Sequence, residues 1–161
     1  MKRVLATTLL LVLLLMPMGS AWARGDGWEP LEFESLDYVG CNDTHFFIDV
    51  TANKSYGRVV TIGGRDVFQI NGTLKETITN LDNGKSVDLT SSGPGTILLE
   101  EPRVIGEGNW LFFLGPGQSG ETGLPDLFTT SGHIDFTVDE NGVFQSFELR
   151  GTMTDLCQVL G

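Results

Sequence analysis

The sequence predicts an all-β protein, an antiparallel up-and-down β-barrel of about eight strands whose termini are tied by one disulfide. Short segments alternate apolar and polar residues with the period of two that marks a half-buried strand. Turn signals rich in Gly, Asn and Asp separate these segments, and helix signals are few. The two cysteines, Cys41 and Cys157, stand at the two ends of the alternating region. A β-sandwich is the alternative fold, in which the disulfide merely ties the termini.

The first 23 residues predict a signal peptide and therefore a secreted, extracellular protein. They comprise a basic start, an apolar run and an Ala-Trp-Ala sequence of the kind that signal peptidase cleaves. Pro17, Gly19 and Ser20 interrupt the apolar run, so we expect no membrane span. Residues 24–40 are expected to form an N-terminal arm with one short strand, and residues 41–161 a single barrel domain.

The first half of the domain alternates clearly. We expect a strand over 46–52, a turn at Asn53, a strand ending near Ile62, and a long strand over 66–81 that follows Gly63-Gly64. Four apolar residues of that long strand are expected on one face: Phe68, Ile70, Leu74 and Ile78.

The second half continues the pattern after "DNG" at 82–84, a strong hairpin signal. Further turns are expected at 93–95 and at 139–142, and the last eight residues are expected to be helical or irregular. The expected strands lie at 85–91, 96–100, 110–114, 132–138 and 143–153. In the fourth of them, Ile134, Phe136 and Val138 should point into the core, and His133, Asp135 and Thr137 away from it.

Cys41 and Cys157 are expected to form the disulfide. An even pair of cysteines in an exported protein predicts a bond. In an up-and-down barrel with an even number of strands, the first and last strands are neighbours, and Cys41 precedes the first regular strand while Cys157 follows the last. A metal or redox pair would need close spacing or His partners, which this pair lacks.

The charge disfavours two classes of partner. The chain carries 10 basic and 21 acidic residues, and loss of Lys2 and Arg3 with the signal peptide makes it still more acidic. Such a surface repels nucleic acid and anionic lipid. We expect a soluble monomer.

The run "WLFFL", residues 110–114, is the candidate binding region. We expect Trp110, Phe112 and Leu114 in the core, and Leu111 and Phe113 covered by the Gly-rich loop 115–125. The candidate binding surface therefore comprises Trp110, Leu111, Phe113 and Leu124, and its partner is a small apolar ligand at the barrel mouth or an extracellular protein.

No catalytic constellation, cofactor site or metal site is expected. Ser131, His133 and Asp135 share one strand face, but residues two apart on a strand lie roughly 7 Å apart. The expected function is that of a secreted, non-catalytic binding protein. One alternative is an interaction or envelope-associated module with a filled barrel, and another is a small barrel cyclase or isomerase with a perturbed His133 or carboxylate in its cavity.

Several segments carry a resemblance to a known group. They are "VTANKSYGR", "ITNLDNGKS", "SGPGT", "WLFFLGPG", "LFTTSG" and "GTMTDLC". Together with the signal peptide, they resemble small secreted β-rich proteins found widely in actinobacteria. The resemblance covers most of the mature chain and implies an exported β domain, but it implies no activity.

Overall fold

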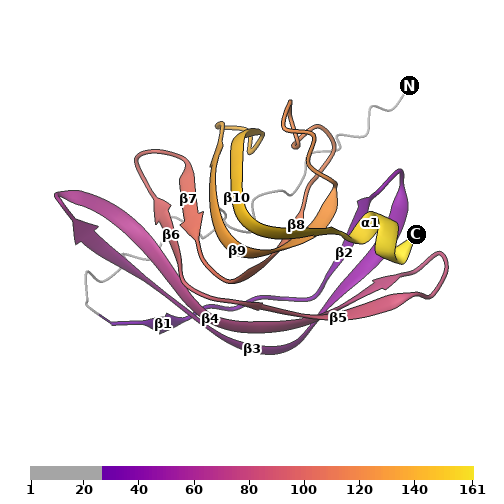
Figure 1. Ribbon diagram of the computed structural model, residues 1–161. Coiled ribbons are helices and arrows are strands. Elements are labelled where there is room, and N and C mark those ends of the chain that lie inside the picture. Colours follow the sequence, from indigo (N-terminus) through magenta and orange to yellow (C-terminus); the bar gives the residue numbers. More distant parts are fainter. Residues whose placement is uncertain (1–26) are drawn as a thin grey trace, which may run out of the picture.

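The computed structural model describes residues 27–161, which form an antiparallel β-sheet and one short helix (Figure 1). The predicted signal peptide and the first residues of the predicted arm lie outside this range. The elements are β1 (Glu29–Pro30), β2 (Leu36–Gly40), β3 (Thr44–Ile62), β4 (Arg65–Asn80), β5 (Ser86–Ser92), β6 (Gly95–Leu98), β7 (Arg103–Gly106), β8 (Asn109–Phe113), β9 (Leu127–Val138), β10 (Phe144–Asp155) and α1 (Leu156–Leu160).

The sheet is a meander in which long strands pair with shorter consecutive ones. β4 pairs along its length with β3, and on its other side with β5 over one half and with β6 over the other. β9 pairs likewise with β8 and β7 on one side and with β10 on the other. β1 and β2 both pair with β3. All these pairings are antiparallel, which confirms the predicted antiparallel all-β class.

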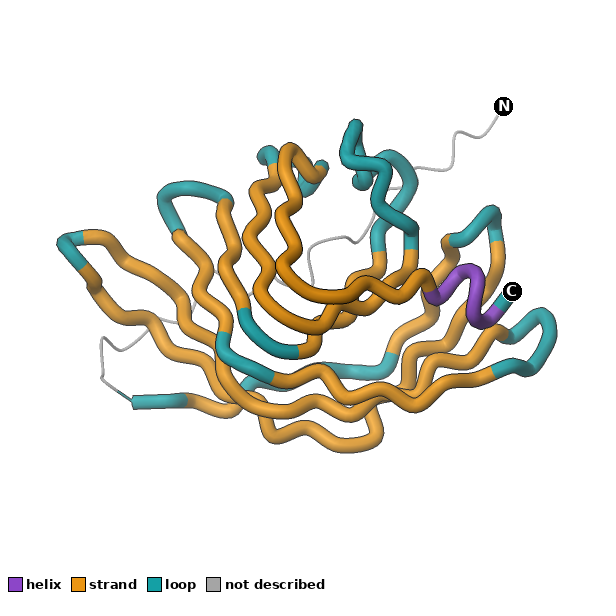
Figure 2. The backbone as a smooth tube through the Cα atoms, in the orientation of Figure 1, coloured by secondary structure: helices purple, strands orange, loops and turns teal. Residues whose placement is uncertain are grey.

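The expected disulfide is present. The Cα atoms of Cys41 and Cys157, 116 residues apart in the chain, lie 5.4 Å apart. Cys41 follows β2 and Cys157 belongs to α1, so the bond ties the turn between β2 and β3 to the C-terminal helix (Figure 2). Among the described residues, β10 forms sheet pairing with β9, and β2 forms sheet pairing with β3.

β3 differs from the prediction because it is one strand of 19 residues. We expected separate strands with a turn at Asn53, since "ANKSYG" is polar and contains Gly. Instead a β-bulge between Val50 and Ala52 absorbs the irregularity, and the pairing with β4 continues through Asn53. Residues of the expected arm pair with the same strand: Glu29 lies opposite Gly57, and Pro30 opposite Tyr56.

Two hydrophobic cores form on opposite faces of β8 and β9. The first core lies against β2–β5 and contains Tyr38, Phe46, Ile48, Ile78, Leu127, Leu156 and Leu160. The second core lies on the other face, where β9 and β10 curve upward (Figure 1), and contains Phe112, Leu114, Phe128, Ile134 and Phe144. Adjacent residues of β8 and β9 point to opposite faces, so each strand contributes to both cores.

Tyr38 connects the first core to the chain between β8 and β9. Its hydroxyl lies 2.7 Å from the carbonyl oxygen of Leu114 and 2.8 Å from that of Asp126. Burial, and next the negative charge of Asp126, raise the pKa of Tyr38 far above its ordinary value, so the hydroxyl stays protonated. This buried donor fixes β2 over the ends of β8 and β9.

Glycines mark the line where the sheet bends and divides. Gly93 separates β5 from β6, and Gly108 separates β7 from β8, with φ angles of 125° and 99°. A Cβ atom on Gly93 would collide with the main chain of Glu107, and one on Gly108 with the main chain of Ser92. The amide of Gly108 donates to Gly132 in β9, and that of Gly132 donates back. Beyond this line β5 and β8 diverge.

Candidate functional site

Two grooves lie along the polar side of β9 and β10. The first, which we call the hydroxyl groove, occupies the space where β5 and β8 diverge and has a volume of about 260 Å³. Its lining comprises Asp88, Leu89, Thr90, Ser91, Asn109, Trp110, Thr129, Thr130, Ser131, Thr152 and Thr154. The second, the charged groove, lies at the opposite end of the same strands and is lined by Glu101, Arg103, Asp135, Thr137, Ser146 and Glu148.

Strand register explains how the hydroxyl groove is assembled. β5 and β8 are paired at Ser92 and Asn109, next to the dividing line, and separate from there. Across the opening, Thr129 and Ser131 of β9 lie directly opposite Thr154 and Thr152 of β10. Residues opposite each other in an antiparallel pair share a face, so these four side chains form a ladder of hydroxyl groups.

A buried carboxylate lies behind this groove. Glu76 on β4 is 4% exposed, and both of its carboxylate oxygens lie within hydrogen-bond distance of the Ser91 hydroxyl, at 3.0 and 3.3 Å. Burial raises the pKa of Glu76, and the hydrogen bonds from Ser91 oppose that rise. Because Ser91 lines the groove, it connects the groove to a buried carboxyl group on the same face of β4 as Ile78.

The second carboxylate near the groove points away from Glu76. Asp88 lies opposite Thr77 and accepts a 2.7 Å hydrogen bond from its hydroxyl. Glu76 lies opposite Leu89, one residue further along each strand, and therefore on the other face of the sheet. The two carboxyl groups cannot act together on one bound molecule, as a general acid and base would have to do.

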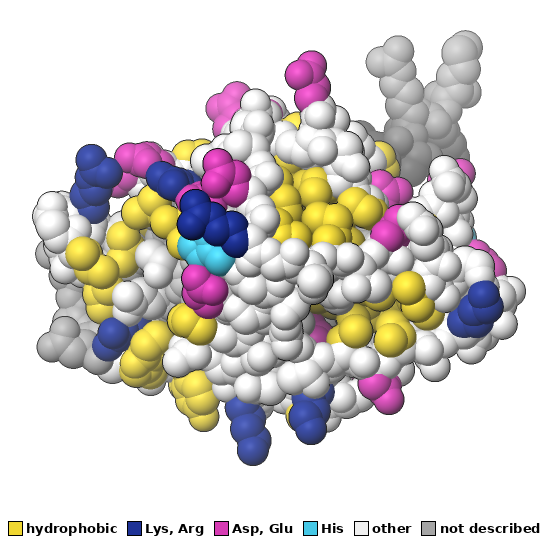
Figure 3. Space-filling model, in the orientation of Figure 1, with side chains coloured by type: hydrophobic (Ala, Val, Ile, Leu, Met, Phe, Trp, Pro, Cys, Tyr) yellow, Lys and Arg dark blue, Asp and Glu magenta, His cyan; other side chains and the backbone are white. Residues whose placement is uncertain are grey.

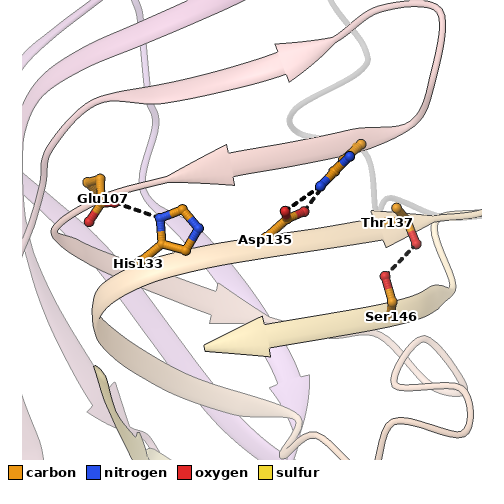
Figure 4. A network of polar contacts seen from close by, with 6 residues as sticks. Glu107, His133, Asp135, Thr137 and Ser146 are labelled. Carbon is orange, nitrogen blue, oxygen red and sulfur yellow. Dashed lines mark hydrogen bonds and ion pairs between the residues drawn. The ribbon is translucent and has the colours of Figure 1, made fainter. Parts of the chain in front are cut away.

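The charged groove is lined mostly by side chains that pair with other side chains (Figure 4). Arg103 donates to both carboxylate oxygens of Asp135, at 2.8 and 2.5 Å, and this bidentate contact holds the pKa of Asp135 below its ordinary value. Nδ1 of His133 lies 2.6 Å from Glu107, and the hydroxyls of Thr137 and Ser146 lie 2.8 Å apart. Figure 3 shows the resulting cluster of acidic, basic and His side chains on this face.

The residues predicted to form the binding surface do not come together. Leu111 and Phe113 pack against the first core, whereas Trp110 and Leu124 pack against the second. Trp110 is the member of this set that lines the hydroxyl groove. Ser131 also lines that groove, while His133 and Asp135 contribute to the charged cluster.

The expected cover of Leu111 and Phe113 needs correction. We expected loop 115–125 to cover them, but β2–β5 do so, and the Tyr38 ring meets that of Phe113 at 5.8 Å. The loop lies with the second core instead, through Leu124. The sequence pattern showed that both faces of β8 are buried, but it did not show which element covers which face.

The sequence reasoning missed the threonine ladder and Glu76. Thr129, Thr152 and Thr154 are not among the residues that the sequence pattern singled out. A signal for Glu76 was present, because strict alternation along β4 puts it on the same face as Leu74 and Ile78. An acidic residue at an apolar position of a strand predicts a buried carboxylate.

Similarity to known proteins does not assign this chain to a family. Comparison with family models, with curated proteins and with solved structures finds no match to this chain. Residues 27–161 contain no helix long and apolar enough to cross a membrane. In the same range, no three His, Cys, Asp or Glu side chains are grouped so that they could hold a metal ion. The class of protein defined so far is a disulfide-tied antiparallel β domain with a hydroxyl-lined groove.

Proposed function

We propose that this protein is a secreted, non-catalytic binding module whose hydroxyl groove binds a neutral carbohydrate chain. The observation that carries the proposal is the lining of the groove. It combines threonine and serine hydroxyls from three strands with an asparagine, a tryptophan and one carboxylate, Asp88. The proposal retains secretion and non-catalytic binding from the sequence-based expectation but replaces the apolar ligand by a polar one.

The chemistry of the lining favours a sugar. A hydroxyl group both donates and accepts hydrogen bonds, so a ladder of hydroxyls can match the hydroxyls of a sugar ring in either role. Asn109 adds an amide that donates and accepts, and the Trp110 ring adds an apolar surface. Asp88 brings one negative charge, and the described lining contains no cation, so a neutral ligand suits the groove better than an anionic one.

Packing argues against the apolar ligand. The second core is occupied by the protein's own rings: Phe112 and Phe128 stack at 4.8 Å, and Phe136 and Phe144 at 5.0 Å. Both grooves described above have mostly polar linings. The orientation of Glu76 and Asp88 to opposite faces supports binding without catalysis.

The export and closure of the domain form part of the same proposal. A disulfide that closes a loop of more than one hundred residues persists in an oxidising compartment, which supports secretion. We interpret the sheet as a flattened barrel, in which the disulfide joins β2 to the segment after β10. A sandwich with tied ends remains the alternative.

Titration with neutral oligosaccharides tests the proposal. The probes are cellotetraose, chitotetraose and maltotetraose, followed by isothermal calorimetry and by amide NMR shifts of the groove residues. Thr152→Val removes one hydroxyl with little change in shape, and it should weaken binding about 3- to 10-fold, the effect of one neutral hydrogen bond.

The matched control is Thr137→Val, the same substitution on the same face but in the charged groove. It should leave oligosaccharide affinity unchanged. If a printed array of neutral glycans gives no binding, or if both variants lower affinity equally, the hydroxyl groove is not a carbohydrate site.

A further inference from the structure

β10 is a long strand with one open edge. Its twelve residues pair on one side with β9. On the other side, the amide of Phe144 donates to Gln118 of loop 115–125, and between residues 145 and 153 the described backbone has no partner beyond β9. An open edge of this length presents a row of unpaired amides and carbonyls to another strand.

The common protections of an edge strand are weak along this segment. Residues 145–153 contain neither proline nor lysine, and Met153 is 38% exposed. The two charged side chains are Glu148 and Arg150, which share one face and are both exposed. Neither forms an ion pair within the described residues.

Glu148 feels the positive charge of Arg103 in the charged groove but forms no ion pair with it. Glu148 lies directly opposite Asp135 on β9, and the carboxylate of Asp135 is engaged by Arg103. Arg150 lies opposite His133, which faces Glu107. Each charge on β10 would therefore gain from an opposite charge on its open side.

We propose that β10 pairs with β10 of a second copy of this chain, antiparallel and in the register that places Leu149 on the two-fold axis. In that register Glu148 faces Arg150 of the second copy, and Arg150 faces Glu148, so both charges are matched twice by symmetry. Shifting the second strand by two residues in either direction would put Glu148 opposite Glu148, or Arg150 opposite Arg150. Charge complementarity thus selects one symmetric pairing.

The other face of the strand fits the same register. Phe147 faces Gly151 of the second copy, and an aromatic ring across from a glycine covers main chain that the glycine leaves exposed. Leu149 faces its own counterpart. On the face of Glu148 and Arg150, Ser146 faces Thr152 of the second copy. The pairing uses the edge of β10 and replaces the expectation of a monomer with that of a symmetric dimer.

Charge-reversal variants test the pairing. Arg150→Glu gives each strand two negative charges and Glu148→Arg gives each two positive ones, so either variant alone should dissociate at least about 10-fold more readily than the wild type. Mixed together, the two variants present opposite charges at every pair and should form a heterodimer, visible as a mixed mass in native mass spectrometry. Lys54→Glu, an exposed charge reversal on β3, is the control and should leave the dimer unchanged.

Each outcome decides the proposal. Sedimentation of the wild type as a monomer at concentrations up to about 1 mM would overturn it. Dimerisation that Arg150→Glu leaves intact would place the interface elsewhere and also overturn it. Circular dichroism establishes that each variant is folded, and hydrogen exchange of wild-type residues 145–153 should slow as protein concentration rises. Oligosaccharide binding is measured separately, so its failure would leave this result unaffected.

Discussion

The two cores of this domain use the same strands but are stabilised differently. The first core is fastened at its margins by the Cys41–Cys157 disulfide and the Tyr38 hydroxyl. At the same end of the domain, the side-chain amides of Asn80 and Asn83 donate to the carbonyl oxygen of Leu160. The central contacts of the second core are between aromatic rings: the ring of Phe112 meets those of Phe128, Phe136, Phe144 and Phe147.

This difference shows how the strand pair β8–β9 can be buried on both faces. The first core contains the C-terminal helix α1, and a chain end is the part of a fold most prone to fray. Covalent and polar ties counter that tendency. The second core is built on the continuous hairpin β9–β10 together with Phe112 and Leu114. The two strands of the hairpin already hold each other, so packing of rings suffices there.

The largest expected effect comes from removing the disulfide, which breaks the fastening of the first core. Replacing both Cys41 and Cys157 by Ser should lower the free energy of unfolding by about 4 to 5 kcal/mol, because the unfolded chain regains the entropy of a long loop. Urea unfolding of the variant and of the wild type measures this loss.

Hydrogen exchange then separates the two cores. In the variant, amides of β2 and α1 should exchange faster by a larger factor than amides of β9. Equal acceleration in both regions would contradict the idea that the disulfide acts mainly on the first core.

A smaller effect is expected from truncating a ring of the second core. Phe128 is fully buried, and its ring meets those of Phe112 and Phe147 at 4.8 and 5.8 Å. Phe128→Ala should cost about 3 to 5 kcal/mol, measured by urea unfolding, because it removes these contacts and leaves a cavity. Phe47→Ala makes the same change at a partly exposed position outside both clusters and should cost clearly less. A similar loss from both would mean that the aromatic cluster is not what stabilises this half.

The sequence predicted the fold better than the site. Alternation and turn chemistry are local, so the strands, the hairpins at 82–84 and 139–142, and the inward face of Ile134 could be foreseen, and the disulfide followed from the cysteine count. The partners of β8 could not be foreseen, because which layer covers Phe113 depends on how the sheet bends at Gly108 and Gly132. The hydroxyl groove depends on register between β9 and β10, which determines that Thr129 meets Thr154.

The smallest expected effect concerns Glu76, the buried carboxyl group behind the hydroxyl groove. Burial raises the pKa of Glu76 above its ordinary value of 4.5, so the folded state holds this proton more tightly than the unfolded state. The contribution of Glu76 to stability is therefore complete below about pH 4.5 and is lost as pH rises through the folded pKa.

Glu76→Gln cannot ionise and still accepts a hydrogen bond from Ser91. Its Tm should match that of the wild type near pH 4 and exceed it near pH 7, by on the order of 2 °C. Glu140→Gln, at an exposed position of the β9–β10 turn, should show no such pH-dependent gain. A Tm difference between Glu76→Gln and the wild type that is the same at both pH values would mean that folding does not shift the pKa of Glu76.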